Sequence, residues 1–215
     1  MRYVLIASLL LFSCNNNADK KNTDDTVNYT SGITRLMKYY PLDSTGAGGE
    51  KLYRTIPAVE LLSQDGKIFN TNSVKGKVVA TDFFFASCQG TCPRMTSQLT
   101  RVQAALKNEP DFKIVSYTVD PARDSVQSLS KYAMMFKADT AQWKFITGEK
   151  KKIYDLARYS YFLPVEPGDG SSEDFIHSDQ IVLLDKDAHI RGYYAGTDSA
   201  SIDSLIVDIR TLLKQ

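Results

Sequence analysis

The 215-residue sequence carries almost no net charge and has few cysteines and histidines, the residues that form disulfides or bind soft metal ions. Its 26 Lys and Arg against 25 Asp and Glu leave a formal net charge of +1, so no basic field exists that would attract a nucleic-acid backbone. It contains three Cys and two His. The apolar run near the N-terminus, within residues 3–12, is too short to span a bilayer as a helix. With 43% hydrophobic residues, the chain is nevertheless long enough for one globular domain with extra sequence at one end.

The first 14 residues have the features of an export signal. One basic residue is followed by the short apolar run, and the Leu-Phe-Ser-Cys junction at residues 11–14 is similar to a bacterial lipobox. We expect residues 1–13 to be a signal peptide, and Cys14 to be the lipidated start of an exported lipoprotein that faces the periplasm from a bacterial membrane. The alternative is a buried N-terminal strand, but residues 15–28 are polar and offer no apolar face.

The remainder divides into a tether, residues 14–50, and a domain, residues 51–215. The tether is polar and ends in a Gly-rich break. In the domain, apolar stretches with strand and helix periodicities alternate. Strands are expected at residues 59–62, 68–70, 77–85, 113–119, 143–147, 180–184 and 189–194, and helices after residue 93, at 124–136, at 149–159 and around 202–212.

This order of elements predicts an α/β fold. Asp65-Gly66 marks a tight hairpin between the first two strands, and the nearly continuous apolar run at residues 77–85 is typical of a strand buried on both faces. Alternating strands and helices, with hairpins before and after, indicate a central mixed sheet flanked by helices. We therefore expect a thioredoxin-like fold with an added N-terminal hairpin.

Two cysteines lie between the buried strand and the following helix. Cys88 and Cys92 are four residues apart, so on a helical turn their side chains share one face and can form a disulfide or bind one metal ion. The amide groups at a helix N-terminus favour the thiolate, which is both the nucleophile and the metal ligand. An inert stabilising disulfide is the alternative, although so short a loop constrains the unfolded chain little.

A third group is needed to distinguish a redox dithiol from a metal site. His177 lies between a polar loop, residues 164–174, and the predicted strand at residues 180–184. Two thiolates and one imidazole suit copper, whereas zinc usually takes a fourth ligand. A hydrogen-bonded loop histidine is the alternative for His177. His189 alternates with apolar residues in its strand, and we expect it to face solvent.

Three motifs in order resemble the Sco/SenC family. They are Phe83-Phe84-Phe85-Ala86-Ser87-Cys88-x-x-x-Cys92-Pro93, then Val119-Asp120-Pro121-x-Arg123-Asp124, then Phe175-Ile176-His177-Ser178 before Leu183-Leu184-Asp185. The resemblance runs from about Leu52 to the C-terminus. It implies a thioredoxin-like, membrane-tethered copper protein that helps assemble the CuA centre of cytochrome c oxidase, with Cys88, Cys92 and His177 as copper ligands. The sequence departs from the common pattern at residues 89–91, where Gln-Gly-Thr replaces a frequent Pro-Asp pair.

The residues and the resemblance together lead to two main hypotheses of function. In the first, the protein is a metallochaperone without enzymatic turnover, which passes copper to the copper-bearing oxidase subunit or another copper protein. In the second, Cys88 and Cys92 form a redox dithiol that keeps the cysteines of an oxidase or another exported protein reduced. His177 distinguishes them, because only copper binding needs it. A third hypothesis is an interaction lipoprotein in which all three residues are dispensable. Asp120 and Arg123 fit either partner docking or a simple turn, with Asp124 as the helix N-cap.

Overall fold

The computed structural model of the protein describes residues 36, 42–45, 51–53, 55–163 and 178–215. Cys14 and the expected signal peptide lie outside the described residues, as does most of the expected tether. Among the helices of the described part, none has both the length and the apolar character needed to cross a bilayer.

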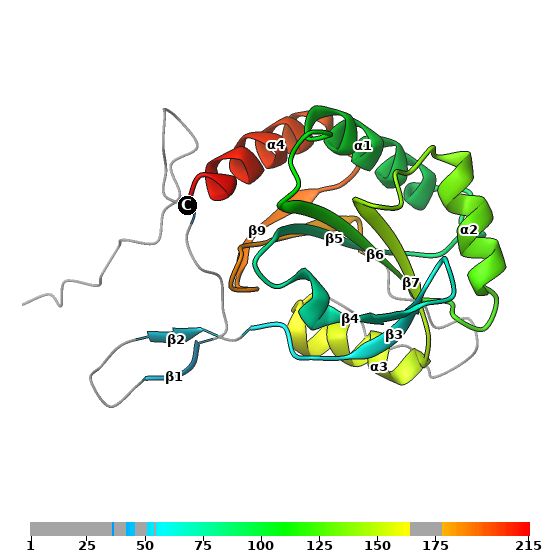
Figure 1. Cartoon of the computed structure of the whole chain (residues 1–215), viewed down its shortest axis with the longest axis horizontal. Coiled ribbons are helices and arrows are strands. Elements are labelled where there is room, and N and C mark those ends of the chain that lie inside the picture. The colour runs from blue at the N-terminus through cyan, green and yellow to red at the C-terminus, as the bar shows by residue number, and fades with distance from the viewer. Residues whose placement is uncertain (1–35, 37–41, 46–50, 54, 164–177) are drawn as a thin grey trace, which may run out of the picture. The chain divides into compact units, whose positions relative to one another are not determined.

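A seven-stranded mixed sheet forms the centre of the domain (Figure 1). Its three middle strands run parallel, and the strands on both sides of them are antiparallel to their neighbours. A separate two-stranded sheet pairs β1 (Leu42–Thr45) with β2 (Lys51–Tyr53). The order across the large sheet is β4 (Ile68–Asn70), β3 (Glu60–Ser63), β7 (Trp143–Thr147), β6 (Phe112–Thr118), β5 (Val78–Phe84), β8 (Gln180–Leu184) and β9 (Ile190–Ala195).

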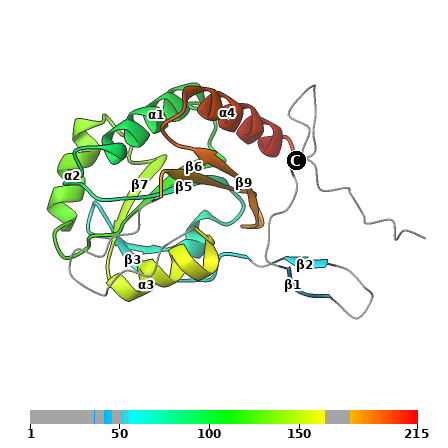
Figure 2. The same cartoon turned by 180° about the vertical axis from the view of Figure 1, so that it is seen from behind.

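Helices cover both faces of this sheet (Figures 1 and 2). On one face, α1 (Thr91–Ala105), α2 (Val126–Met135) and α4 (Ser199–Leu213) bury their apolar stripes together with alternate residues of β5. On the other face lie α3 (Lys150–Asp155) and the π-helical turn η2 (Leu156–Ser160), and a short 3-10 helix, η1 (Thr71–Val74), follows β4. The expected mixed sheet between two helical layers is confirmed.

The burial of β5 and α1 explains why the dithiol lies where it does. All seven residues of β5 are buried, as the near-continuous apolar run predicted. In α1 the predicted stripe is buried in the same layer: Met95, Leu99 and Val102 are each fully inaccessible. Because both elements are fixed by the core, the short segment between them, residues 85–90, is held at both ends. That segment carries Cys88.

Candidate metal centre

The dithiol lies at the carboxyl end of β5, where the chain turns into α1. Cys88 belongs to the connecting segment and is partly exposed, whereas Cys92 lies in the first turn of α1 and is 7% exposed. Both are free thiols in this structure. Ligand sites of α/β proteins commonly lie at the carboxyl ends of parallel strands, and β5 and β6 are such a pair. The Cys88 and Cys92 thiols hydrogen-bond to each other, so the structure brings these two side chains together.

The Cys88 thiol is surrounded by hydrogen-bond donors. Its partial burial alone would raise its pKa, but the backbone amides of Cys92, Gly90 and Thr91 and the Cys92 thiol outweigh this effect. The pKa of Cys88 is therefore held below its usual range. This is the environment that the start of a helix offers to an anion, since its first amide groups lack helical partners. Cys88 is the readily ionised member of the pair.

Cys92 has the opposite environment. Burial raises the pKa of the Cys92 thiol, and the hydrogen bond to Cys88 and the negative charges of Cys88 and Asp82 raise it further, while a backbone contact with Phe85 opposes them. The two sulfurs thus differ in both exposure and acidity. Cys88 is a partly exposed thiol that ionises more readily than usual, and Cys92 is a buried thiol that loses its proton only when a cation or a new bond replaces it.

A buried carboxyl group, Asp82, lies in β5 on the same side of the sheet as the dithiol. One of its oxygens accepts a short hydrogen bond from the Ser116 hydroxyl, which in turn accepts from Trp143 Nε1 at 2.9 Å. The other oxygen, Oδ2, is buried and has no hydrogen-bond partner within the described residues. Burial raises the pKa of Asp82 to about 7, against the effect of the Ser116 hydrogen bond.

The first turn of α1 is fixed by a second buried polar group. The Thr96 hydroxyl donates to the Cys92 carbonyl oxygen at 2.9 Å and lies 2.9 Å from the Tyr132 hydroxyl. Burial raises the pKa of Tyr132 well above its usual range, and the negative charges of Asp82 and of the dithiol add to the effect, so its hydroxyl stays protonated. These contacts tie the turn that carries Cys92 to α2.

The loop after β6 reaches back to the dithiol segment. Asp120 forms an ion pair with Arg123, whose side chain is 54% exposed. Asp124 does not cap α2, contrary to the expectation: Ser125 is the N-cap, and its hydroxyl accepts from the Ser128 amide at 3.2 Å. The Asp124 carboxylate turns the other way and accepts a hydrogen bond from the Ala86 amide at 3.0 Å.

His177 lies outside the described residues. The described chain resumes at Ser178, whose hydroxyl accepts from the Gln180 amide at 3.3 Å. In the antiparallel pairing of β5 with β8, Thr81 faces Val182. The start of β8 is therefore at the carboxyl end of β5, the end from which the dithiol segment leaves.

His189 does not face solvent as expected. Its side chain is 15% exposed, packs against the edge of Tyr53 and lies 3.4 Å from the Asp185 carboxylate. Asp185, Asp187 and His189 group their potential ligand atoms within 4.8 Å. The Asp185 carboxylate, however, is already engaged by Arg191 at 3.0 Å and by the backbone amides of residues 187 and 189. The group stabilises the β8–β9 hairpin.

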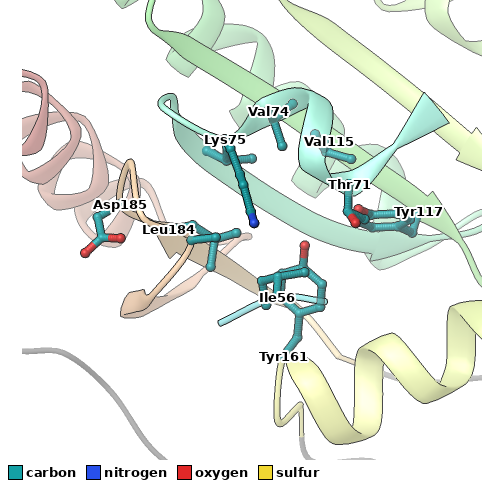
Figure 3. Close-up of a pocket in the computed structure, with 11 residues that line it drawn as sticks. Ile56, Thr71, Val74, Lys75, Val115, Tyr117, Tyr161, Leu184 and Asp185 are labelled. Atoms are coloured by element: carbon teal, nitrogen blue, oxygen red, sulfur yellow. The ribbon is translucent and has the colours of Figure 1, made fainter. Parts of the chain in front are cut away.

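A small cavity of about 10 Å³ lies in the opposite layer of the sheet (Figure 3). Most of its lining is aliphatic or aromatic, including Ile56, Val115 and Tyr161, with Lys75 and Asp185 among the polar residues. Its apolar lining residues belong to the core beneath α3, whereas Cys88 and Cys92 pack in the core beneath α1. The cavity is thus separate from the dithiol.

Comparisons with known proteins agree with this geometry. The SCO1/SenC family model matches residues 49–214. The chain is 32% identical to the SCO1 protein homolog of Bacillus subtilis, over 69% of this chain and 78% of that protein. It is 29% identical to a Stutzerimonas stutzeri protein named provisionally as copper-binding, over 65% of this chain and 69% of that one.

Solved structures show the same fold. A SCO1/SenC family lipoprotein from Bacillus anthracis superposes with a TM-score of 0.66 at 29% identity, covering 74% of this chain and 94% of that one. BsSco, described as a Sco-family cytochrome c oxidase assembly protein with a disulfide switch, also has a TM-score of 0.66, at 28% identity, covering 85% of this chain and 98% of that one. The thioredoxin-like architecture is confirmed, and because the family model spans most of the sequence, the chain belongs to the SCO1/SenC family.

Proposed function

We propose that this protein binds copper through Cys88, Cys92 and His177 and delivers it to the CuA-bearing subunit of cytochrome c oxidase. The observation that carries the proposal is the pair of free thiols, one partly exposed and one buried, at the start of α1. Support also comes from relatives, since one similar protein is named as copper-binding and another is described as an oxidase assembly protein.

The donor atoms fit the metal. Soft sulfur ligands select copper over hard cations, and an imidazole nitrogen completes a three-ligand site that zinc, which usually takes four ligands, would leave open. Cys88 offers a thiolate without a large cost because helix-start amides already stabilise the negative charge. Cys92 is the second sulfur ligand, and His177 the nitrogen ligand from the segment that leads into β8.

The unequal thiols suggest an order of events. Cys88, the more exposed and more acidic sulfur, meets an incoming copper ion first. Cys92 holds its proton until the ion arrives and releases it on ligation, because a thiol must be deprotonated to bind a metal. Transfer to the partner proceeds in the reverse order by ligand exchange, so that Cys88, facing the exposed side, is the last sulfur to release the ion.

A second candidate function is thiol–disulfide exchange, favoured by the same difference between the sulfurs. The Cys88 thiolate would attack a partner disulfide and form a mixed disulfide as one partner sulfur leaves as a thiolate. Cys92, once deprotonated, would then attack the Cys88 sulfur and release the second partner sulfur. The partner ends as a dithiol and this chain as a Cys88–Cys92 disulfide, which the disulfide switch described for BsSco parallels.

We further propose that the domain is held at a bacterial membrane, facing the periplasm, through a lipid on Cys14. The proposal rests on the lipobox-like junction at residues 11–14 and is supported by the similar Bacillus anthracis protein, which is described as a lipoprotein. A lipid chain on the N-terminal residue of the mature protein would fasten it without a membrane-spanning helix.

The decisive experiment compares the two functions in one set of variants. Cells carrying His177→Ala, Cys88→Ser or the control His189→Gln, at matched protein level, are grown at limiting copper and assayed for cytochrome c oxidase activity. Copper delivery requires both His177→Ala and Cys88→Ser to fail while the control stays active. Normal activity of His177→Ala with loss in Cys88→Ser would instead establish the thiol–disulfide function and refute copper delivery.

Copper binding is measured directly on the purified full-length protein with its thiols reduced. Wild-type protein should bind one copper ion per chain, and Cys88→Ser and Cys92→Ser should each lose most of that binding. His177→Ala should lose copper(II) before copper(I), because two thiolates alone can hold copper(I) in a near-linear geometry. Equal copper(II) binding by the wild type and His177→Ala would exclude this histidine as a ligand.

A further inference from the structure

The segment that carries Cys88 is anchored by a residue far away in the sequence. Asp124 is 2% exposed and lies in the loop between β6 and α2. One of its carboxylate oxygens, Oδ2, accepts hydrogen bonds from both the Ala86 amide, at 3.0 Å, and the Thr118 hydroxyl. Ala86 is two residues before Cys88, so the anchor acts within the dithiol segment itself.

Asp124 is itself held firmly in place. Its amide donates to the Asp120 carbonyl oxygen at 2.8 Å, and its own carbonyl oxygen accepts from the Thr147 hydroxyl at 2.9 Å. The Thr118 hydroxyl also accepts from the Asp120 amide at 3.0 Å. Contacts from β6, β7 and its own loop therefore fix the carboxylate before it meets Ala86. An acceptor held in this way imposes its position on its donor, rather than following it.

The anchor restricts where Cys88 can lie. The chain extends by at most about 3.6 Å per residue, so a fixed Ala86 keeps the Cys88 backbone within about 7 Å of it. The Cys88 amide also donates to the Phe85 carbonyl oxygen at 3.2 Å, which closes the segment into a turn. Without the Ala86 bond, this turn is free to swing away from α1, and the Cys88 sulfur leaves the amide groups of Gly90, Thr91 and Cys92 that surround it.

We propose that Asp124 is a positioning residue for the dithiol: through Ala86 it holds the Cys88 sulfur at the start of α1, where it meets both copper and Cys92. Only the effect of Asp124 on copper affinity rests on the proposed function. Its effect on the position of Cys88 does not, because the dithiol geometry exists without a metal. Asp124 acts through geometry and not through its charge. One oxygen accepts both hydrogen bonds, so an amide oxygen in the same place can do the same.

The experiment compares Asp124→Ala, Asp124→Asn and Thr118→Val in the full-length protein. The first readout is the equilibrium between dithiol and disulfide in a glutathione buffer, and the second is copper affinity. Asp124→Ala should shift the dithiol–disulfide equilibrium away from the disulfide by about 10-fold, because the Cys88 sulfur is no longer held beside Cys92. It should also weaken copper affinity by about 10-fold or more, the loss typical when a group that orients a metal ligand is removed. Asp124→Asn should restore both to within about 2-fold of wild type, because its oxygen keeps both bonds.

Thr118→Val is the matched control, because it removes a buried hydrogen bond from the same carboxylate but leaves the bond to Ala86. It should lower stability but shift the dithiol equilibrium and copper affinity clearly less than Asp124→Ala does, because the backbone bonds of Asp124 to Asp120 and Thr147 still hold its carboxylate beside Ala86. The proposal is overturned if Asp124→Ala leaves both readouts unchanged, or if Thr118→Val shifts them as much as Asp124→Ala does. A charge effect, and not positioning, would be shown by Asp124→Asn behaving like Asp124→Ala.

Amide hydrogen exchange of Ala86 in the wild-type protein keeps the test independent of whether any variant folds. The Ala86 amide should exchange at least about 100-fold more slowly than an exposed amide, because it donates to a buried carboxylate. Exchange at the rate of an exposed amide would overturn the proposal. If the wild type bound no copper, the proposed function would fail, and the glutathione equilibrium and the amide exchange would still decide the role of Asp124.

Discussion

Asp82 makes the stability of this domain depend on pH in an unusual direction. The unfolded-state pKa of an aspartic acid is about 3.9, and burial raises the folded-state pKa of Asp82 to about 7. Between these values the folded protein holds a proton that the unfolded chain has released. Stability therefore falls as the pH rises through this window, the reverse of the behaviour of a salt-bridged carboxylate.

The size of the effect follows from the same shift. Each unit of pH within the window changes the free energy of unfolding by 1.36 kcal/mol per group, so Asp82 should cost the folded state about 3 kcal/mol between pH 5 and pH 8. Asp82→Asn should abolish this loss. Its oxygen can accept from Ser116, and its amide group occupies the position of the unpartnered Oδ2, as the hydroxyl of the neutral acid does.

The measurement is urea unfolding at pH 5 and pH 8 with the thiols kept reduced. Trp143, the single and fully buried tryptophan, reports unfolding by its fluorescence. Wild type and Asp82→Asn should have similar stability at pH 5, and the variant should be more stable at pH 8 by about 3 kcal/mol. The control Asp203→Asn removes an exposed carboxylate from α4, and its stability should show the same change between pH 5 and pH 8 as that of the wild type. Equal pH dependence of Asp82→Asn and wild type would mean that Asp82 is already ionised at pH 5, and would refute the reasoning.

Three further predictions concern the anchor, the metal and the core. Cys14→Ser should release the protein from membranes without affecting copper binding, and its retention in the membrane fraction would count against lipidation of this residue. Copper binding and disulfide formation should exclude each other, because both use the Cys88 and Cys92 sulfurs. Free thiols and bound copper, measured in one oxidised sample, should therefore both be depleted. A fully oxidised protein that still held one copper ion per chain would contradict the shared site. Leu99→Ala should lower the free energy of unfolding by roughly 2–5 kcal/mol, because Leu99 is fully buried between α1 and the sheet. The control Val207→Ala, on the exposed face of α4, should lower it by about 0.5 kcal/mol or less. Similar losses for the two variants in urea unfolding would contradict the assignment of Leu99 to the core.

Local patterns in the sequence were enough to predict the framework of the fold. The apolar run that became β5 and the stripe of α1 reflect burial in a core, and burial requires apolar side chains at fixed periods. The Asp65-Gly66 turn was equally visible, because Gly66 adopts a positive φ of 76° that few other residues tolerate. The dithiol followed from these elements, since a cysteine pair between a buried strand and a helix can lie nowhere else.

Contacts between distant residues could not be predicted in the same way. Asp124 has the sequence context of a helix cap, and only the position of Ala86, 38 residues earlier, shows that its carboxylate serves the dithiol segment. Asp82 stands out as a lone carboxyl group in an apolar run, which was a usable signal, but its partner Ser116 is 34 residues away. His189 alternates like a surface residue, yet Asp185 and Tyr53 cover it.

The buried pair of Arg191 and Asp185 organises one end of the domain. Arg191 also donates to the carbonyl oxygen of Leu36, which fixes the start of the folded chain beside β9. Leu184 pairs with Val79, so Asp185 lies at the amino end of β5, and the dithiol lies at its carboxyl end. The Leu36 carbonyl, held by the same arginine, therefore lies toward the end of β5 opposite to the two sulfurs. Loss of the Arg191 side chain would release Leu36 and the β8–β9 turn without touching the segment that carries Cys88.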